Sequence, residues 1–293
     1  MKLTGIPYTD ACEQGMKRAA DELGIDAVFL GPATPGDSDQ QVELIEKQIE
    51  ARVDAIVISP NDPEAVKPAV ERAKEAGIEV FTWDSDAPDT GRAFYVCAVD
   101  DIYVGIALLD RVAKEIGEEG KVAIISGGTS ARNLNLHIRG IEGAARKYPD
   151  IQLLSPYIYN DEDQQKAVGG VVAALRTHPD VKAFISVNSP GVPGAARAVL
   201  QAGKEGKIRI WGISTPDENR DFIKKDIVHG LITWDPAKLT YLTARLVNDY
   251  LDGNEPYDGM EIEGIGKLRV TPNGTVMMHG VTITDENIDK YRF

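Results

Sequence analysis

Short apolar runs that alternate with amphipathic segments restrict what this chain can fold into. Residues 55–58 are apolar at every position, which is typical of a strand in a parallel sheet covered on both faces. Amphipathic segments separate such runs; within residues 10–23, for example, Met16, Ala19 and Leu23 form one apolar stripe at helical spacing. This strand–loop–helix order predicts an α/β protein with doubly wound sheets.

The strand–helix order recurs along most of the chain. With 293 residues, the chain is longer than one hydrophobic core normally serves, so we expect two α/β lobes of similar architecture. The last forty or so residues differ, because they contain only short strand-like pieces. The expected strands cover residues 27–30, 55–59, 78–83, 94–96, 122–126, 151–157, 183–187, 208–213, 230–233, 267–270 and 276–278.

The charge of the chain excludes several classes of partner. Lysine and arginine number 32 against 46 aspartates and glutamates, which gives a net charge of −14. A surface this acidic repels nucleic acid and anionic lipid, so we expect no nucleic-acid partner. The two cysteines and four scattered histidines have neither the number nor the spacing of a disulfide scaffold or a zinc site.

The usual signatures of enzymes are also missing. Residues 127–130 read Gly-Gly-Thr-Ser, but no Gly-Lys-Ser/Thr follows, as a phosphate-binding P-loop requires. Ser214 lacks the nucleophile context of a hydrolase, and no dinucleotide fingerprint follows a first strand. Asp84 and Asp86 lie two positions apart, a poor arrangement for a glycosidase pair that must flank its substrate. We therefore expect a protein without catalytic activity and without a cofactor.

Polar and aromatic side chains follow several of the expected strands. Ligands of open α/β sheets bind beyond the carboxyl ends of the strands. Carboxylates and amides exchange hydrogen bonds with hydroxyl groups, and indole rings stack on the apolar face of a sugar. The pattern therefore favours a neutral, polyhydroxylated ligand. The candidate residues are Trp83, Asp84, Asp86, Asn133, Asn135, Asn160, Asn188, Ser214, Thr215, Trp234 and Asp235.

Many of these residues also have a purely structural interpretation. The two aspartates near residue 85 are good turn formers, and Asn188 could cap the helix that follows it. Asn133 and Asn135 lie in the first turn of a predicted helix, where they could also act as caps. Residues 234–236, Trp-Asp-Pro, fit a helix start with aspartate as the cap and proline at the first helical position. The residues alone leave these alternatives open.

Several stretches of the chain together resemble a known family. They are residues 2–5, 82–86, 212–216, 264–267 and 286–293. In this order and spacing they resemble the periplasmic sugar-binding proteins of ABC importers, in the ribose-binding-like class. Within that class the chain is most similar to the branch that binds autoinducer-2 and rhamnose. The resemblance covers essentially the whole chain.

The resemblance implies an architecture and a role. It implies the periplasmic binding protein-like I fold, with two Rossmann-like lobes that close over one ligand. It also implies that the closed protein is presented to an ABC permease in the membrane. It also implies a monomer that works in the periplasm or, with a lipid anchor, outside the cell. Crossings between the lobes are implied near residues 99–100, 233–235 and 270–271. The implied lobes are residues 1–99 with 236–269, and residues 100–235 with 270–293.

The resemblance also assigns ligand contacts to individual residues. Asp84 matches a strand-end aspartate that holds ligand hydroxyls, and Lys2 matches the lysine with which autoinducer-2 binders hold their ligand. Tyr8 and Thr9 occupy positions where the family often has stacking aromatic residues; Tyr8 fits this pattern and Thr9 does not. Asn188 matches an asparagine that contacts ribose.

Three further contacts follow from the same resemblance. Either Asn133 or Asn135 occupies the position of a polar ligand contact. Trp234 and Asp235 match contacts on the hinge side of the site.

Departures from the family pattern narrow the choice of ligand. The autoinducer-2 branch has an Asp-Gln pair near the helix start where this chain has residues 132–135, Arg-Asn-Leu-Asn. It also has proline and alanine around residues 187–189, where this chain has Val-Asn-Ser. A small sugar is therefore the preferred ligand, with autoinducer-2 as the alternative.

The N-terminus differs from the family as well. Family members carry a leader and an apolar first strand before the matching lysine, whereas Lys2 lies at the start of this sequence. Loss of that strand exposes two neighbouring strand edges. We therefore expect a truncated chain, and we expect it to be less stable than its relatives.

Overall fold

The computed structural model describes residues 1–293 and divides them into two compact units. The boundaries differ from the prediction in three places: Ser130–Asn133 and residues 234–235 belong to unit 1, and the tail stays in unit 1 beyond residue 270. The tail was expected to leave the first lobe at residue 270, but it stays in unit 1 until His279, because the strand Thr275–Met277 pairs in parallel with the strand Tyr95–Cys97. Unit 1 contains Met1–Val99, Ser130–Asn133 and Trp234–His279, and unit 2 contains Asp100–Thr129, Leu134–Thr233 and Gly280–Phe293.

Unit 1 is built on a five-stranded sheet with the order β1-β2-β3-β13-β12. The pairs β1–β2, β2–β3 and β3–β13 are parallel, and only β12 runs antiparallel. A separate two-stranded ribbon, β10–β11, precedes β12. The strands are β1 (Ala55–Ile58), β2 (Glu79–Trp83), β3 (Tyr95–Cys97), β10 (Glu261–Ile262), β11 (Gly266–Lys267), β12 (Arg269–Val270) and β13 (Thr275–Met277).

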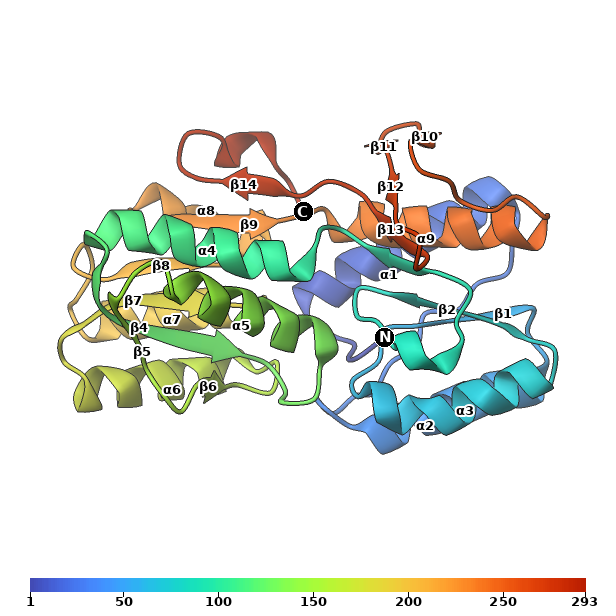
Figure 1. Cartoon of the computed structure of the whole chain (residues 1–293), viewed down its shortest axis with the longest axis horizontal. Coiled ribbons are helices and arrows are strands. Elements are labelled where there is room, and N and C mark those ends of the chain that lie inside the picture. The colour runs from blue at the N-terminus through green and yellow to red at the C-terminus, as the bar shows by residue number, and fades with distance from the viewer. The chain divides into compact units, whose positions relative to one another are not determined.

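Two pairs of helices pack in unit 1, α1 against α9 and α2 against α3 (Figure 1). The close approach of α1 to α9 depends on Gly15, because a Cβ atom there would lie 2.0 Å from the carbonyl oxygen of Ala237. Proline at or near the first position and an aspartate cap begin both α3 and α9. The helices are α1 (Pro7–Leu23), α2 (Ser38–Ala51), α3 (Pro63–Glu75), η1 (Pro88–Thr90) and α9 (Pro236–Leu251).

Unit 2 contains a larger sheet with the order β14-β9-β8-β7-β4-β5, and β6 also pairs with β4. The strand predicted over residues 151–157 forms as two short strands, β5 and β6, which pair with the two ends of β4. The strands are β4 (Glu119–Ser126), β5 (Asp150–Leu153), β6 (Ile158–Tyr159), β7 (Val181–Ser186), β8 (Arg209–Gly212), β9 (Gly230–Thr233) and β14 (Val281–Ile283).

The core of unit 2 lies between this sheet and its helices. Phe184, Ile210 and Leu231 come from adjacent strands and are fully buried against apolar residues of α6 and α7. No helix of the chain combines the length and the apolar content that a membrane crossing requires. The helices are α4 (Asp101–Ile116), α5 (Arg132–Ala145), α6 (Gln164–Thr177), α7 (Gly191–Gln201), α8 (Pro216–Lys224) and η2 (Ile288–Lys290).

One predicted strand does not form. Residues 27–30 are extended chain without a strand partner, and Val28 is 68% exposed. A cavity of about 560 Å³ separates this segment from β1 and is lined by apolar side chains that include Phe29, Leu44 and Trp83. The prediction was wrong because apolar composition alone does not make a strand; backbone hydrogen bonds to a neighbouring strand do.

Filling this cavity is expected to stabilise unit 1. Met1 lines the cavity, so an added extension of about six Val and Ile residues before Met1 can pair with β1 and bury its side chains. Each buried side chain contributes about 1.5–3 kcal/mol, so the melting temperature should rise by several degrees. Scanning calorimetry would measure it. An extension of the same length made of Gly and Ser is the control, and equal melting temperatures for the two extensions would refute the prediction.

Candidate functional site

Asp84 lies at the centre of a polar cluster in unit 1, directly after β2. Its φ angle is +61°, in the left-handed region that aspartate and asparagine tolerate better than most residues. The backbone N–H of Asp84 donates to Val96 O at 2.9 Å, and the hydroxyl of Tyr95 donates to Asp84 O at 3.0 Å. The turn therefore holds the carboxylate at the carboxyl end of the sheet, and only 8% of the residue is exposed.

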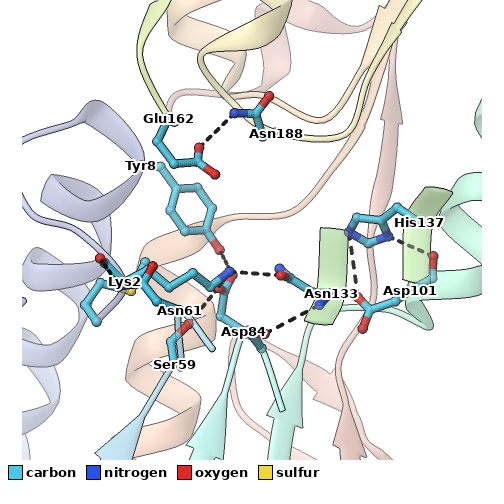
Figure 2. Close-up of polar contacts among 12 residues, drawn as sticks. Lys2, Tyr8, Ser59, Asn61, Asp84, Asp101, Asn133, His137, Glu162 and Asn188 are labelled. Atoms are coloured by element: carbon cyan, nitrogen blue, oxygen red, sulfur yellow. Dashed lines mark hydrogen bonds and ion pairs between the residues drawn. The ribbon is translucent and has the colours of Figure 1, made fainter. Parts of the chain in front are cut away.

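Three side chains that are distant in sequence bind the Asp84 carboxylate (Figure 2). Lys2 Nζ lies 2.9 Å from Oδ2. The hydroxyl of Tyr8 donates to Oδ1 at 2.7 Å, and the hydroxyl of Ser59 donates to Oδ2 at 2.9 Å. We call these four residues the Asp84 cluster.

Neighbouring residues hold the Asp84 cluster in place. Lys2 Nζ also donates to Asn133 Oδ1 at 3.0 Å, and Asn61 Nδ2 donates to the carbonyl oxygen of Lys2 at 2.8 Å. The indole N–H of Trp234 donates to the Tyr8 hydroxyl at 3.1 Å. Four predicted site residues, Lys2, Tyr8, Asn133 and Trp234, are thus joined with Asp84 in one hydrogen-bond network.

Charge fixes the protonation states in this cluster. Burial acts to raise the pKa of Asp84, but the Lys2 charge and the hydrogen bonds from Lys2, Tyr8 and Ser59 outweigh it and hold that pKa below its ordinary value. Burial and the Asp84 charge raise the pKa of Tyr8 well above its ordinary value. The Asp84 cluster therefore holds an ionised carboxylate and a neutral phenol at neutral pH.

Unit 2 carries a second polar cluster, formed by the side chains of Asn160, Glu162 and Asn188. Asn188 Nδ2 donates to Asn160 Oδ1 at 2.8 Å and to Glu162 Oε2 at 2.9 Å. Asn160 Oδ1 also accepts a hydrogen bond from the backbone N–H of Glu162 at 3.0 Å. These residues follow β6 and β7, whose carboxyl ends flank that of β4. We call them the Glu162 cluster.

Asp86, a predicted site residue, has a structural partner. Arg92 binds its carboxylate through two nitrogens, with Nε 2.5 Å from Oδ1 and Nη2 2.7 Å from Oδ2, and the Thr82 hydroxyl donates to Oδ1 at 2.6 Å. Both charged side chains are buried. Asp86 therefore anchors the strand end that carries Asp84.

Trp83 and Thr9 also have structural surroundings. Trp83 precedes Asp84 by one position. Because side chains alternate along a strand, the Trp83 side chain lies on the face of the sheet opposite to that of Asp84. It lines the apolar cavity and meets the ring of Phe29 edge-on at 6.3 Å. The Thr9 hydroxyl accepts from the backbone N–H of Ile6 and donates to its carbonyl oxygen, which caps α1.

Four other predicted residues make local hydrogen bonds. Asn135 Nδ2 donates to Thr129 O at 2.9 Å, and Ser214 Oγ donates to Ser189 O at 2.8 Å. Asp235 caps α9, as the structural alternative predicted. Thr215 is the N-cap residue of α8, and its hydroxyl donates to Glu218 Oε2 at 2.7 Å.

The sequence analysis missed three polar residues of these two clusters and their surroundings. Ser59 ends the predicted strand 55–59, so the strand-end criterion that selected Asp84 could have found it. The Asn61 side chain donates to the backbone carbonyl of Lys2, a contact that the sequence does not indicate. Glu162 lies two positions after Asn160, in a run of acidic residues that reads as an ordinary helix start.

Both clusters suit binding rather than catalysis. Each pairs a carboxylate with amides or hydroxyls, and these groups form hydrogen bonds with ligand hydroxyls. The Ser59 hydroxyl donates to the Asp84 carboxylate, but Lys2 and Tyr8 bind the same carboxylate and its pKa lies below the ordinary value, which makes it a weak base for activating a nucleophile. No group of three or more His, Cys, Asp or Glu side chains is arranged to hold a metal ion.

Comparison with known proteins adds a family match. A model of the periplasmic binding protein domain matches residues 1–255. The ribose import binding protein of Bacillus subtilis is 25% identical over 249 residues, which cover 85% of this chain and 79% of that protein.

Two solved structures share the fold. One is an ABC transporter solute-binding protein from Clostridium phytofermentas with bound L-rhamnose, with a TM-score of 0.91 and 24% identity over 99% of this chain and 95% of that one. The other is LsrB from Clostridium saccharobutylicum in complex with AI-2, with a TM-score of 0.90 and 24% identity over 100% of this chain and 98% of that one. At this identity the two structures establish the fold alone.

The Asp84–Lys2 ion pair is expected to make stability fall in acid. Because the pKa of Asp84 is lower in the folded chain than in the unfolded chain, its contribution is complete above about pH 4 and is lost as the pH falls through the folded value. Asp84→Asn should cost about 3 kcal/mol at neutral pH, because Lys2 loses its buried partner. Urea unfolding of both proteins from about pH 7 to pH 3 should show this difference shrinking.

The control for this experiment is Asp89→Asn, which removes an exposed carboxylate in the same loop. Its stability should follow that of the unsubstituted chain at every pH. A stability difference between Asp84→Asn and the unsubstituted chain that stays constant with pH would contradict the prediction.

Proposed function

Because the chain belongs to the periplasmic binding protein family, we propose that it is the sugar-binding component of an ABC importer. Relatives in this family are solute-binding proteins and not enzymes. The Asp84 cluster is the observation that carries the choice of a sugar. Its ionised carboxylate and its lysine are held in place by tyrosine, serine and asparagine side chains, and such a rigid polar set matches the vicinal hydroxyls of a sugar.

The role in import defines the partners. The bound sugar is delivered to a permease in the membrane, so the protein works in the periplasm or at the outer surface of the cell. We propose that it acts as a monomer, and that a lipid anchor is one way to keep it near the membrane. Tyr8, Asp84 and Asn133 are the unit 1 side chains that we propose as direct ligand contacts.

Uptake of autoinducer-2 is the alternative function. The observation that favours it is Lys2, which matches the lysine of autoinducer-2 binders and directs its ammonium group at Asp84 and Asn133. The AI-2 complex of LsrB has the same fold as this chain. The two functions differ only in the ligand, so one binding screen distinguishes them.

A thermal-shift screen is expected to identify the ligand. The panel contains D-ribose, D-allose, D-apiose, L-rhamnose, D-arabinose and the precursor of autoinducer-2. A ligand at about 100 times its dissociation constant stabilises the folded chain by about 2.7 kcal/mol, which gives a visible shift of the melting temperature. A shift only with the autoinducer-2 precursor would support the alternative, and conversion of a bound sugar into product would contradict the binding role.

The fluorescence of Trp234 offers a second readout of binding. Its indole N–H is hydrogen-bonded to the Tyr8 hydroxyl, so a ligand that reaches Tyr8 should change the emission. We expect Trp234→Phe to lose most of this change while isothermal titration still detects binding. We expect Asp84→Asn to weaken binding about tenfold or more, because charge-assisted hydrogen bonds contribute about 1.5–3 kcal/mol. Unchanged affinity in Asp84→Asn, with Asp89→Asn as control, would remove Asp84 from the site.

A further inference from the structure

The buried ammonium group of Lys2 is carried by a segment that belongs to no helix or strand. Lys2 Nζ contacts Asp84 Oδ2 at 2.9 Å and Asn133 Oδ1 at 3.0 Å. A lysine side chain has a flexible four-carbon stem, so it keeps two such contacts only while its backbone is fixed. The position of this charge therefore depends on what holds the backbone of residues 1–2.

Side-chain amides hold that backbone. Gln41 Nε2 donates to the carbonyl oxygen of Met1 at 3.0 Å, and Asn61 Nδ2 donates to the carbonyl oxygen of Lys2 at 2.8 Å (Figure 2). The two carbonyl groups belong to adjacent residues. The two amides therefore fix two successive peptide groups, and Lys2 lies between them.

Gln41 makes two further hydrogen bonds to the backbone. It belongs to α2 and is only 3% exposed. Its Nε2 also donates to Ser59 O at 2.9 Å, which uses both hydrogens of the amide group, and its Oε1 accepts from the N–H of Asn61 at 2.9 Å. One buried side chain thus joins α2, the segment that carries Lys2 and the loop that follows β1.

The backbone that Gln41 holds carries both groups that contact Asp84 Oδ2. One is Lys2 Nζ, and the other is the Ser59 hydroxyl, each at 2.9 Å. Asn61, whose backbone N–H is bound by Gln41, in turn donates to the carbonyl oxygen of Lys2. Gln41 therefore acts on the buried ion pair through these neighbours.

The surroundings of Gln41 explain why a polar side chain is needed at this position. Gln41 lines the apolar cavity of unit 1 together with Leu44 and Ile45, which follow it by one turn of α2. An apolar residue in its place would leave the carbonyl oxygens of Met1 and Ser59 without these hydrogen bonds, and buried polar groups without partners are costly.

We propose that Gln41 is a positioning residue of the Asp84 cluster, which keeps Lys2 and Ser59 on the Asp84 carboxylate and thereby sets the affinity for the ligand. The part of this inference that concerns affinity rests on the proposed sugar-binding function. The part that concerns the hold on Asp84 rests on the hydrogen bonds of unit 1 alone.

The first test measures the pKa of Asp84. Burial acts to raise this pKa, whereas the Lys2 charge and the hydrogen bonds from Lys2, Tyr8 and Ser59 lower it below its ordinary value. Gln41→Met keeps the length of the side chain and removes its three hydrogen bonds. If Lys2 and Ser59 then move, the pKa of Asp84 should rise toward its ordinary value. Carbon-13 NMR of the side-chain carboxyl, assigned with Asp84→Asn, follows this titration.

The second test measures affinity by isothermal titration with D-ribose and L-rhamnose. We expect Gln41→Met to weaken binding of the sugar that the chain binds by about tenfold, because a less fixed site loses more freedom when it binds. In the Asp84→Asn background the same substitution should cause little further loss, since two residues that act through one another are not additive.

Two controls separate positioning from a general loss of stability. Gln40→Met makes the same change at the neighbouring residue, whose amide oxygen binds the loop before α2, and should leave the pKa of Asp84 and the affinity unchanged. Asn287→Leu removes two hydrogen bonds from a side chain to the backbone in unit 2. It should lower the free energy of unfolding and leave both readouts unchanged.

A milder variant carries the test if Gln41→Met does not fold. Gln41→Asn keeps the amide group but shortens the side chain by one carbon, so it cannot reach both carbonyl oxygens that Gln41 binds. Its effects on the pKa of Asp84 and on affinity should have the same direction and be smaller.

The outcomes are distinguishable. An unchanged pKa of Asp84 in a folded Gln41 variant would refute the positioning role and leave the proposed function intact. A raised pKa with unchanged sugar affinity would also overturn the inference, because the positioned groups would then not serve binding. If the unsubstituted chain binds no sugar of the panel, the proposed function fails, while the pKa of Asp84 still decides whether Gln41 holds the cluster.

Discussion

The ion pair between Lys2 and Asp84 is the interaction on which the unit 1 site depends. Both side chains are largely removed from water, with 11% and 5% of their area exposed, and two such charges are unfavourable unless each has a close partner and further hydrogen bonds. Tyr8 and Ser59 supply these bonds to the carboxylate, and Asn133 supplies one to the ammonium group. The geometry of five side chains therefore follows from the need to satisfy two buried charges.

This requirement also explains why Asp84 and Asp86, two similar residues in one loop, have different roles. Arg92 binds Asp86 through two nitrogens, and this fork uses both carboxylate oxygens. The Lys2 ammonium group contacts one oxygen of the Asp84 carboxylate. The hydroxyls of Tyr8 and Ser59 make the remaining contacts to this carboxylate. Hydroxyl groups of a ligand are chemically similar to these hydroxyls and can join or replace them. A ligand hydroxyl cannot replace the Arg92 guanidinium on Asp86 in this way.

Local sequence patterns predicted most of the fold and part of the candidate site. Apolar runs and caps located β1, β7 and α9 because burial on both faces and helix starts are local properties. The strand predicted over residues 27–30 does not form, because a strand needs a neighbouring strand to pair with, and apolar composition does not show whether one is present. The strand-end rule found Asp84, yet it also selected Trp83, which faces the apolar cavity. Glu162 was missed because its position depends on a left-handed turn and on a glycine from another loop.

The charge balance of the Asp84 cluster bears on what that cluster can bind. One positive and one negative charge neutralise each other there, so the cluster offers hydrogen bonds without a preference for ligand charge. The net charge of −14 repels anions, but salt screens it beyond about 8 Å, so it slows the approach of an anionic ligand rather than discriminating at the site. The Asp84 cluster therefore discriminates between ligands by the geometry of their hydrogen bonds and not by their charge.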